Sequence, residues 1–358
     1  MNTDKNKLHF TKKLLSWNTD SNSRQMPWKG EKDPYKIWLS EIILQQTRVE
    51  QGLNYYNRFI TTFPTVQQLA NAPEKKVFKL WEGLGYYTRC KNLIATAKYI
   101  SKELNGKFPD KYEEILALKG IGPYTAAAIA SFAYELPHAV VDGNVFRVLS
   151  RYFNITLPID STNGKIFFTK LAADLLDKKS PGIYNQALMD FGATICKPQL
   201  PLCEICVLKK YCEAYKEGIV NTLPVKEKSI VKKTRWFYYL IFKHNDHIYI
   251  RKRPGNDIWE NLYEFMLVEN DKALNKKEIE ALPVIKQIVP EGSKILFISK
   301  EYKQLLTHQT IRGQFIQIDL PEIITLKGFK AVSPAAFKKL PFPKFITLYL
   351  EDKNVSLN

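Results

Sequence analysis

The first part of the chain carries apolar side chains at helical spacing, interrupted by short polar turns. A helix is predicted to begin at Pro34, because proline suits the first helical turn, and its apolar positions continue through Val49. Apolar residues from Val145 to Tyr152 predict another helix. Further helices are predicted over residues 53–63, 73–81, 91–104, 165–176 and 184–196. The pattern therefore predicts an all-helical first domain, residues 1–220.

The pattern changes after residue 220. Residues 221–234 (NTLPVKEKSIVKKT) are basic and have little apolar periodicity, which predicts a linker. Beyond them, RWFYYLIF and HIYIRKR are β-rich runs on either side of a turn, and residues 295–320 predict two more strands. Short helices are predicted at 335–340 and 344–350. Residues 235–358 should therefore form a second, mixed α+β domain.

Composition and charge narrow the possible partners. With 358 residues, 45% of them hydrophobic, the chain can fold into two domains that each bury a core. Lys and Arg exceed Asp and Glu by 53 to 36, and this net charge of +17 favours nucleic acid first and a membrane surface second. No apolar stretch approaches the ~18 residues of a transmembrane helix, and the N-terminus is charged, without the apolar core of a signal peptide. We therefore expect a cytoplasmic protein.

The stretch from Leu118 to Asn144 combines a glycine turn with a lone acidic residue. Gly120 and Gly122 flank one apolar residue, which suits a tight turn between helices, since glycine tolerates positive φ. Free N–H groups at the start of the following helix can hold a phosphate. Asp142 comes about twenty residues later, so the pair suggests chemistry on DNA. The alternative is an ordinary helix turn and an aspartate that only caps the next helix.

Two other segments carry candidate chemistry. Glu41 lies among apolar residues in WLSEIILQQTR, so it either faces solvent or is partly buried with a raised pKa. The polar residues 45–48 that follow can contact bases or phosphates. The glycine-flexed segment 82–89 presents Leu84 and paired tyrosines, which can wedge between bases. The alternative for this segment is a turn between helices whose aromatic side chains belong to the core.

Four of the five cysteines lie close together, in the pattern C-x6-C-x2-C-x5-C. In a reducing compartment this spacing indicates metal binding and not disulfides. Four thiolates can bind zinc or a 4Fe–4S cluster, and one compact loop with all four ligands favours the cluster, whose four irons each need a thiolate. The fifth cysteine, Cys90, is expected to be a small core residue. The four predicted ligands are Cys196, Cys203, Cys206 and Cys212.

These motifs together resemble the helix-hairpin-helix DNA glycosylase superfamily in its endonuclease III branch, and more closely the adenine DNA glycosylase family. The runs that carry the resemblance are PWK, WLSEIILQQTRV, WEGLGYYTR, LKGIGPYTAAAI, VDGNVFRVLSR and YNQALMDFGATIC. They cover residues 24–218 densely and the second half more loosely. The resemblance implies a monomeric enzyme of base excision repair. Its substrate would be double-stranded DNA in which adenine is mispaired with 8-oxoguanine or guanine, and it would hydrolyse the N-glycosidic bond of that adenine.

The resemblance also implies catalytic roles. Family members that cut the DNA backbone place a lysine where this chain has Tyr124, and a phenol cannot form the required imine. Hydrolysis without strand cleavage is therefore expected. Glu41 would protonate N7 of adenine, and an ionised Asp142, favoured by its position before a helix, would stabilise the sugar cation. Tyr124 and Asn144 would position Asp142 or the attacking water.

Binding roles follow from the same resemblance. The base pocket would be lined by Arg24, Trp28, Leu44, Gln186 and Met189, with Gln186 reading the base; helix packing is the alternative role of Gln186 and Met189. Gln46 and Tyr86 would fill or wedge the base stack, while Thr47 and Leu84 would contact the opposite strand. Gly120 and Gly122 would hold a DNA phosphate. Backbone carbonyls of Leu116, Leu118 and Ile121 would bind a monovalent cation.

The second domain resembles the NUDIX-like module of adenine DNA glycosylases, which recognises 8-oxoguanine. It lacks the glutamate-rich box of hydrolytic NUDIX enzymes, so no pyrophosphohydrolysis is expected. The family's recognition loop has Phe-Ser-His or Phe-Thr-His, whereas this chain has Leu306, Thr307 and His308, and the last two are predicted to contact the lesion. Two alternatives remain: a glycosylase removing thymine from G:T pairs, and a non-catalytic iron–sulfur protein that binds DNA. Glu41 and the NUDIX-like half argue against the first, and the pair Glu41 and Asp142 against the second.

Overall fold

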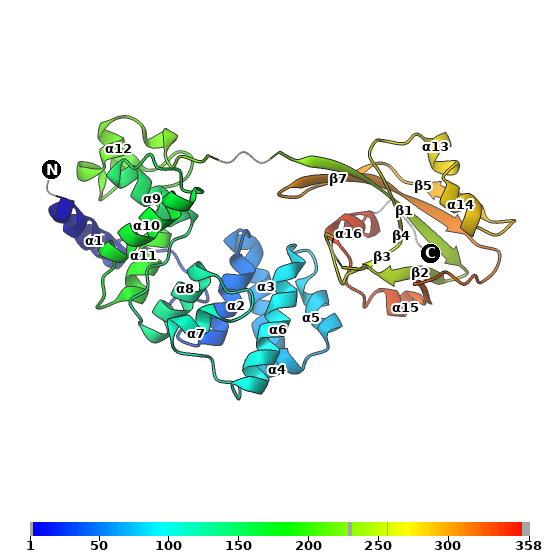
Figure 1. The fold of residues 1–358 in the computed structure, drawn as a ribbon, viewed down its shortest axis with the longest axis horizontal. Coiled ribbons are helices and arrows are strands. Elements are labelled where there is room, and N and C mark those ends of the chain that lie inside the picture. The colour runs from blue at the N-terminus through cyan, green and yellow to red at the C-terminus, as the bar shows by residue number, and fades with distance from the viewer. Residues whose placement is uncertain (1–2, 228–230, 256, 353–358) are drawn as a thin grey trace. The chain divides into compact units, whose positions relative to one another are not determined.

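The computed structural model describes residues 3–227, 231–255 and 257–352 (Figure 1). Its contacts divide the chain into two units. The first unit comprises Met1–Asn71 and Asn92–Ser229, and the second comprises Ala72–Lys91 and Ile230–Asn358. Among the described residues, no helix is both long enough and apolar enough to cross a membrane.

The first unit is helical, as the sequence predicted. Its helices are α1 (Thr3–Asp20), α2 (Pro34–Leu44), α3 (Val49–Thr62), α4 (Val66–Asn71), α7 (Tyr112–Leu116), α8 (Pro123–Tyr134), α9 (Gly143–Phe153), α10 (Thr162–Leu175), α11 (Pro181–Thr194) and α12 (Glu213–Lys216). Helix α6 (Tyr87–Glu103) crosses the boundary between the units, and α5 (Glu74–Trp81) belongs to the second. The cysteine loop contains two single 3₁₀ turns, Cys203–Ile205 and Lys209–Tyr211, and a third such turn, Val220–Thr222, follows α12.

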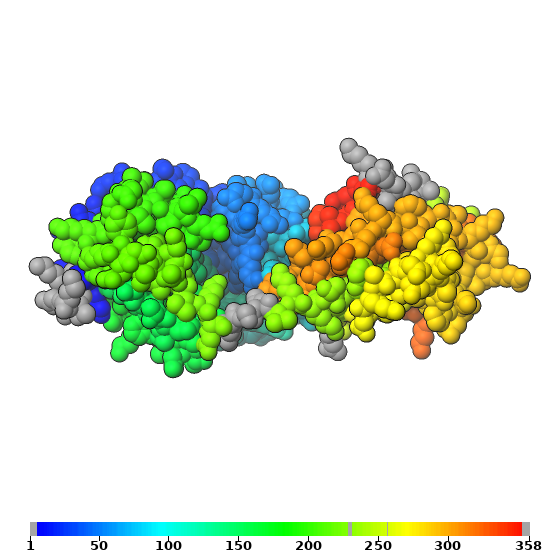
Figure 2. Space-filling view, turned by 90° about the horizontal axis from the view of Figure 1, so that it is seen from above, coloured from blue at the N-terminus to red at the C-terminus, as the bar shows by residue number. Residues whose placement is uncertain are grey.

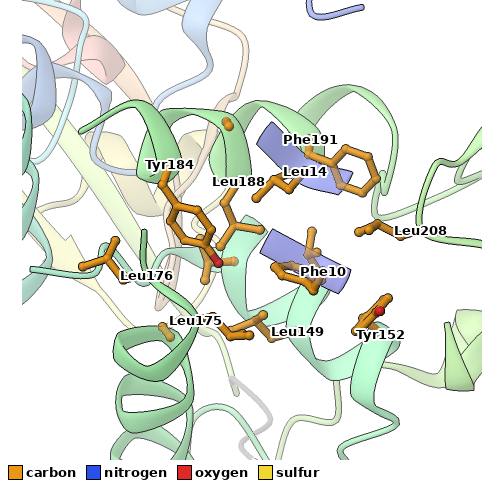
Figure 3. Close-up of a cluster of buried hydrophobic side chains, with 14 of the residues drawn as sticks. Phe10, Leu14, Leu149, Tyr152, Leu175, Leu176, Tyr184, Leu188, Phe191 and Leu208 are labelled. Carbon is orange, nitrogen blue, oxygen red and sulfur yellow. The ribbon is translucent and has the colours of Figure 1, made fainter. Parts of the chain in front are cut away.

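Helix α1 was not among the helices predicted from the sequence, the first of which begins at Pro34. Phe10, Leu14 and Trp17 are spaced three to four residues apart, so they form one apolar stripe on the helix. The stripe packs against Leu149 of α9 and Phe191 of α11, in the main core of this unit (Figure 3). The blue helix lies beside the green α10 and α11 in Figures 1 and 2. The N-terminal segment is therefore a core element of the first unit.

The predicted hairpin joins α7 to α8. Gly120 has φ of +79°, and the N–H of Ile121 donates to the carbonyl of Leu118 at 3.1 Å, which closes the turn. A Cβ at Gly120 would lie 2.6 Å from Cβ of Asn92, so both the backbone angle and the space require glycine. Pro123 begins α8 immediately after the turn. The prediction of a tight glycine turn at this position is confirmed.

The second unit is built on an eight-stranded sheet within the described residues, ordered β3-β2-β1-β7-β5, with β4 on β1, β6 on β7 and β8 on β2. The parallel neighbours β1 (Lys233–His244) and β7 (Gln309–Asp319) form its centre. The other strands are β2 (His247–Lys252), β3 (Tyr263–Glu264), β4 (Met266–Asn270), β5 (Lys294–Ile298), β6 (Tyr302–Leu305) and β8 (Lys330–Val332). The predicted α+β class is confirmed, although residues 295–320 form parts of three strands and not two.

Helices cover both faces of this sheet, which explains why six consecutive residues of β1 are buried. On one face, Leu240 packs in a cluster with Ile279 of α13 (Lys276–Glu280) and Ile285 of α14 (Pro283–Ile288). On the other face, Phe315 stacks on Tyr349 of α16 (Lys344–Leu350), with ring centroids 4.0 Å apart. The short α15 (Pro334–Phe337) precedes α16, so both helices predicted near the C-terminus are present.

The predicted linker is partly held by the first unit. The N–H of Ile159 donates to the carbonyl of Val225 at 3.1 Å, and the N–H of Glu227 donates to Asp160 at 2.9 Å. At the other end, Lys233 already belongs to β1. Residues 228–230 of the predicted linker lie outside the described residues. Backbone hydrogen bonds, which composition does not reveal, therefore shorten the segment that can act as a linker.

Candidate active site

Glu41 is carried into the interior by α2. Asp33 caps this helix by accepting from the N–H of Tyr35 at 2.9 Å, and Pro34 occupies its first turn. Most of α2 is buried on all sides, so Glu41 is only 5% exposed. Burial is the main cause that raises the pKa of Glu41 to about 7; a hydrogen bond to Tyr124 opposes the rise and the charge of nearby Asp142 adds to it. Of the two positions that the sequence left open, the structure has the buried one.

Tyr124 lies in the first turn of α8, which packs against α2. Its ring belongs to a cluster with Ala127, Ala128 and Val140, and its hydroxyl hydrogen-bonds Glu41. Burial raises the pKa of this phenol well above its usual value, and the neighbouring charges of Glu41 and Asp142 add to the rise. Tyr124 is therefore a neutral hydrogen-bonding group next to two carboxyls.

Asp142 caps α9. Its Oδ1 accepts from the N–H of Val145 at 2.8 Å, and its Oδ2 accepts from the side-chain amide of Asn144 at 2.7 Å. Part of Asp142 is exposed, but burial of its carboxyl raises the pKa above 3.8, while the bonds from Val145 and Asn144 and the charge of Arg147 lower it. The sequence predicted that the helix start would favour the anion. The hydrogen bonds do act in that direction, but desolvation outweighs them.

Arg147 is a functional candidate that the sequence analysis missed. One turn into α9, it donates to Oδ1 of Asn144, to the carbonyl of Gly192 and to the carbonyl of Cys196, each at 2.8 Å. A Cβ at Gly192 would lie 2.6 Å from Cβ of Asn144, so glycine permits α11 to approach this closely. Arg147 therefore connects the residue that orients Asp142 with the start of the cysteine loop. Its one sequence signal was an arginine three positions after Asn144, between the apolar pairs 145–146 and 148–149.

Two of the four loop cysteines hydrogen-bond Arg151, a second buried arginine of α9. Arg151 donates to Sγ of Cys196 at 3.5 Å, and the thiol of Cys212 donates to the carbonyl of Arg151 at 3.5 Å. Burial raises the pKa of Cys206 to about 12 and that of Cys212 to about 11, and each thiol also feels the charges of other loop cysteines. All four are free of disulfides. In the described part of the chain, no three His, Cys, Asp or Glu side chains converge closely enough for one metal ion.

Asp190 joins two of the predicted base-pocket residues and was also missed. It is fully buried, and its Oδ1 accepts from Arg24 and from the Gln186 amide, both at 2.9 Å. Met189, the neighbour of Asp190, contacts the cluster that contains Tyr124. The ring of Trp28 is buried edge-on against Tyr56, with centroids 5.2 Å apart. The sequence shows that Asp190 follows Gln186 by four residues, but it does not show that Asp190 binds Arg24, which lies in the segment before α2.

The segment after α2 combines exposure with an unusual backbone. Gln46 is exposed and has φ of +55°, which is uncommon for a residue other than glycine. Leu44 and Thr47 are half-buried on either side of it. On the hairpin, an added Cβ at Gly122 would meet no atom within 4 Å, so the space in front of that residue is open. Of the three carbonyls predicted to bind a cation, that of Leu118 accepts the N–H of Ile121, and Leu116 ends α7.

The remaining predicted residues lie together in the second unit. Leu84, Tyr86, Thr307 and His308 line one cavity of about 450 Å³. The Tyr86 hydroxyl hydrogen-bonds the Thr307 hydroxyl, and Tyr86 has φ of +48°. Leu306 is also part of the lining, at the position where the family resemblance predicts a phenylalanine. Residues 257–260 form part of the lining that the sequence analysis did not predict.

Comparison with known proteins places these features in context. Residues 39–162 match the model of the HhH-GPD superfamily of base excision DNA repair proteins, and residues 237–352 match a NUDIX domain. The chain is 36% identical over 314 residues to the adenine DNA glycosylase of Buchnera aphidicola subsp. Baizongia pistaciae, covering 85% of this chain and 84% of that one. It is 42% identical over 214 residues to the human adenine DNA glycosylase, covering 57% of this chain and 39% of that one.

Solved structures share the helical fold. A thermostable thymine-DNA glycosylase matches with a TM-score of 0.56 and 29% identity, over 61% of this chain and 100% of that one. Endonuclease III in a non-covalent complex with DNA matches with a TM-score of 0.53 and 20% identity, over 61% of this chain and 99% of that one. At 20% identity, the second likeness concerns the fold alone.

Proposed function

We infer that this chain excises adenine from DNA, because it belongs to the adenine DNA glycosylase family. It is a DNA N-glycosylase of base excision repair. A glycosylase of this kind breaks the bond between a base and its deoxyribose, which requires a leaving group, a stabilised sugar cation and a water. We assign the first two of these requirements to Glu41 and Asp142 of the first unit.

The proton for the leaving group comes from Glu41 in this proposal. An adenine in a duplex is stacked and paired, so it must leave the helix before a side chain can reach it. Protonation at N7 then makes it a better leaving group. Because burial raises the pKa of Glu41 to about 7, this carboxyl still holds a proton near neutral pH. That buried, proton-retaining carboxyl beside Tyr124 and Asp142 is the observation that carries the proposal.

Asp142 stabilises the sugar cation that forms as the base departs. Its two oxygens are oriented by Val145 and Asn144, and the charge of Arg147 favours its ionised form. Tyr124 hydrogen-bonds Glu41 and has no amine, so no imine to the sugar can form and water completes the reaction. The enzyme therefore hydrolyses the glycosidic bond without cutting the strand.

The base pocket combines Arg24, Trp28, Leu44, Gln186 and Met189. Support comes from the shared contact of Arg24 and Gln186 with Asp190, and from the packing of Met189 in the cluster that contains Tyr124. The net charge of +17 supports double-stranded DNA as the partner. We assign one DNA phosphate to the N–H groups at Gly120 and Gly122, because open space lies in front of Gly122.

The base opposite the adenine is 8-oxoguanine or guanine. Thr307 and His308 contact this base, and the cavity that they share with Leu84 and Tyr86 has a volume in the range of small-molecule sites, ~300–1,000 Å³. Gln46 and Tyr86 enter the base stack. Both side chains are exposed, and both residues have positive φ. Thr47 and Leu84 contact the opposite strand. Cytoplasmic location and a monomeric state stay predictions from the sequence.

A 4Fe–4S cluster fits the cysteine loop by the chemistry of its donors. Four free thiols lie within electrostatic range of one another, next to the cationic side chain of Arg151. Cys196, Cys203, Cys206 and Cys212 would hold the cluster as thiolates, and it would cross-link residues 196–212 into a rigid loop. Arg147, bonded to the carbonyl of Cys196, holds the start of that loop against α9. A monovalent cation at the carbonyls of Leu116, Leu118 and Ile121 stays a prediction from the family resemblance.

The Glu41→Gln variant tests the assignment of the acid. Glutamine keeps the size and the hydrogen bonding of Glu41 but has no proton to transfer. The purified variant should bind an adenine:8-oxoguanine duplex as tightly as the unaltered protein and release no adenine, as measured by alkaline cleavage of the product strand. Normal turnover by the variant would remove Glu41 from the mechanism.

A panel of duplexes separates the alternatives. The likeness to a thymine-DNA glycosylase makes a thymine:guanine duplex the necessary control. Thymine release without adenine release would support that activity, and no excision from any duplex would support a non-catalytic DNA-binding protein. Borohydride trapping tests strand cleavage separately, because only an imine can be reduced to a stable protein–DNA adduct.

A further inference from the structure

We propose that Asp190 is a positioning residue that sets which end of the Gln186 side-chain amide faces the excised base. The inference rests on the proposed adenine excision. Asp190 is fully buried in α11, and it forms ion pairs with Arg24 at 2.9 Å and Lys29 at 3.0 Å. A carboxylate held by two cations is ionised, and an ionised carboxylate accepts hydrogen bonds but donates none.

The donors are divided between the two oxygens of Asp190. Oδ1 accepts from Arg24 and from Nε2 of Gln186, both at 2.9 Å. Oδ2 accepts from the side-chain amide of Asn22 at 2.9 Å and from Lys29 at 3.0 Å. If the Gln186 amide turned over, its own oxygen would face an anion, and that contact is repulsive. Asp190 therefore holds the NH₂ group of Gln186 and leaves Oε1 on the other side.

Oε1 of Gln186 is thereby presented as a hydrogen-bond acceptor. Gln186 is half-buried, and no donor from the described residues hydrogen-bonds its Oε1. Met189 lies three residues further on, hence on the same face of α11, and it packs against the same cluster of Ala127, Ala128 and Val140 as Tyr124 does. Tyr124 in turn hydrogen-bonds Glu41. The acceptor therefore lies on the helix face that packs toward the proposed acid.

An acceptor at this position discriminates between purines by their substituent at C6. Adenine carries an amino group there, which donates to Oε1. Hypoxanthine carries a carbonyl, whose lone pairs would face those of Oε1 and leave both oxygens without a partner. The contact between Asp190 and Gln186 is therefore a selectivity device, and its effect should appear in the ratio of the two excision rates and not only in the rate with adenine.

The experiment measures single-turnover excision of adenine and of hypoxanthine, each placed opposite 8-oxoguanine in the same duplex. The unaltered protein should release adenine at least about tenfold faster, the factor expected for one hydrogen bond gained or lost in a buried site. Asp190→Ala frees the amide to turn, so this ratio should fall about tenfold. Asp190→Asn keeps the volume of the side chain and should also lower the ratio. A carboxamide donates hydrogen bonds as well as accepting them, so it can bind either end of the Gln186 amide.

Two further variants identify the cause. Lys29→Met removes a cation from the other oxygen of Asp190 and should leave the ratio unchanged. In a Gln186→Leu background, Asp190→Ala should have no further effect on the ratio, since it acts through the amide. An unchanged ratio in whichever Asp190 variant folds, or an equal shift in Lys29→Met, overturns the proposal. Absence of adenine release by the unaltered protein would instead overturn the proposed function.

Discussion

Replacing Glu41 by glutamine should stabilise the first unit, and this gain should grow as the pH rises. Burial raises the pKa of Glu41 from 4.5 to about 7, so the folded protein binds a proton that the unfolded chain has already released in this range. The unaltered protein therefore loses stability as the pH rises from the unfolded pKa of Glu41 to its folded pKa. Glutamine does not ionise and has no such loss.

The size of the effect follows from the difference between the two pKa values. At about 1.4 kcal/mol for each tenfold change in the ionisation equilibrium, the rise from 4.5 to about 7 corresponds to about 3 kcal/mol above pH 7. Because Glu41 is only 5% exposed, solvent screening reduces this figure little. Below the unfolded pKa the effect vanishes. A domain of this size shifts its melting temperature by about 2–4 °C per kcal/mol, so the variant should melt about 6–12 °C higher above pH 7.

Calorimetric melting of both proteins between about pH 5 and about pH 8 provides the assay, since this window spans most of the ionisation. Any change in packing or in the Tyr124 hydrogen bond shifts all melting temperatures equally, so the dependence on pH is the decisive quantity. Glu50→Gln, an exposed position on α3, is the matched control and should show no growing difference. A constant difference across the range, or one larger at low pH, would refute the buried, proton-retaining state of Glu41.

Four further outcomes follow from the same geometry. Adenine excision should fall as the pH rises through about 7, because the proton-bearing form of Glu41 is lost, and single-turnover rates across the range would contradict this if they stayed flat. Arg147→Met should lower the free energy of unfolding by about 2–4 kcal/mol, and with it the melting temperature, and should reduce both adenine excision and the amount of bound iron. If the variant kept its melting temperature, its excision rate and its iron, the connecting role of Arg147 would be refuted. Leu149→Ala should cost about 2–5 kcal/mol in denaturant unfolding with little change in the excision rate of the folded protein. Ending the chain at residue 227 should lower discrimination between 8-oxoguanine and guanine, and undiminished discrimination would argue against the roles of Thr307 and His308.

Local patterns predicted much of the fold. Apolar periodicity located α2, α9 and α11, and the glycine spacing located the turn at Gly120, because each signal is contained within a few neighbouring residues. Helix α1 was not predicted, for the opposite reason. Its stripe of Phe10, Leu14 and Trp17 is thin among polar residues, and it becomes a core element only when α9 and α11 supply the facing surface. Runs of β-branched and aromatic residues predicted β1, β2 and two strands over residues 295–320, but not β3, β4 or β8. The parallel pairing of β1 with β7 joins segments far apart in the chain, so no local pattern indicated it.

The chemical groups of the site were determined by the sequence alone: a glutamate among apolar residues, a tyrosine in place of lysine, an aspartate before a helix, and four cysteines within one loop. Their states were decided by the tertiary structure. Helix α2 is apolar on nearly every side, so periodicity could not tell whether Glu41 faces solvent, and only the packing of α8 against α2 removed its water. Arg147 and Asp190 likewise acquired their roles from partners on other segments, because a buried charge is defined by the groups that surround it, and those groups meet only in the folded chain.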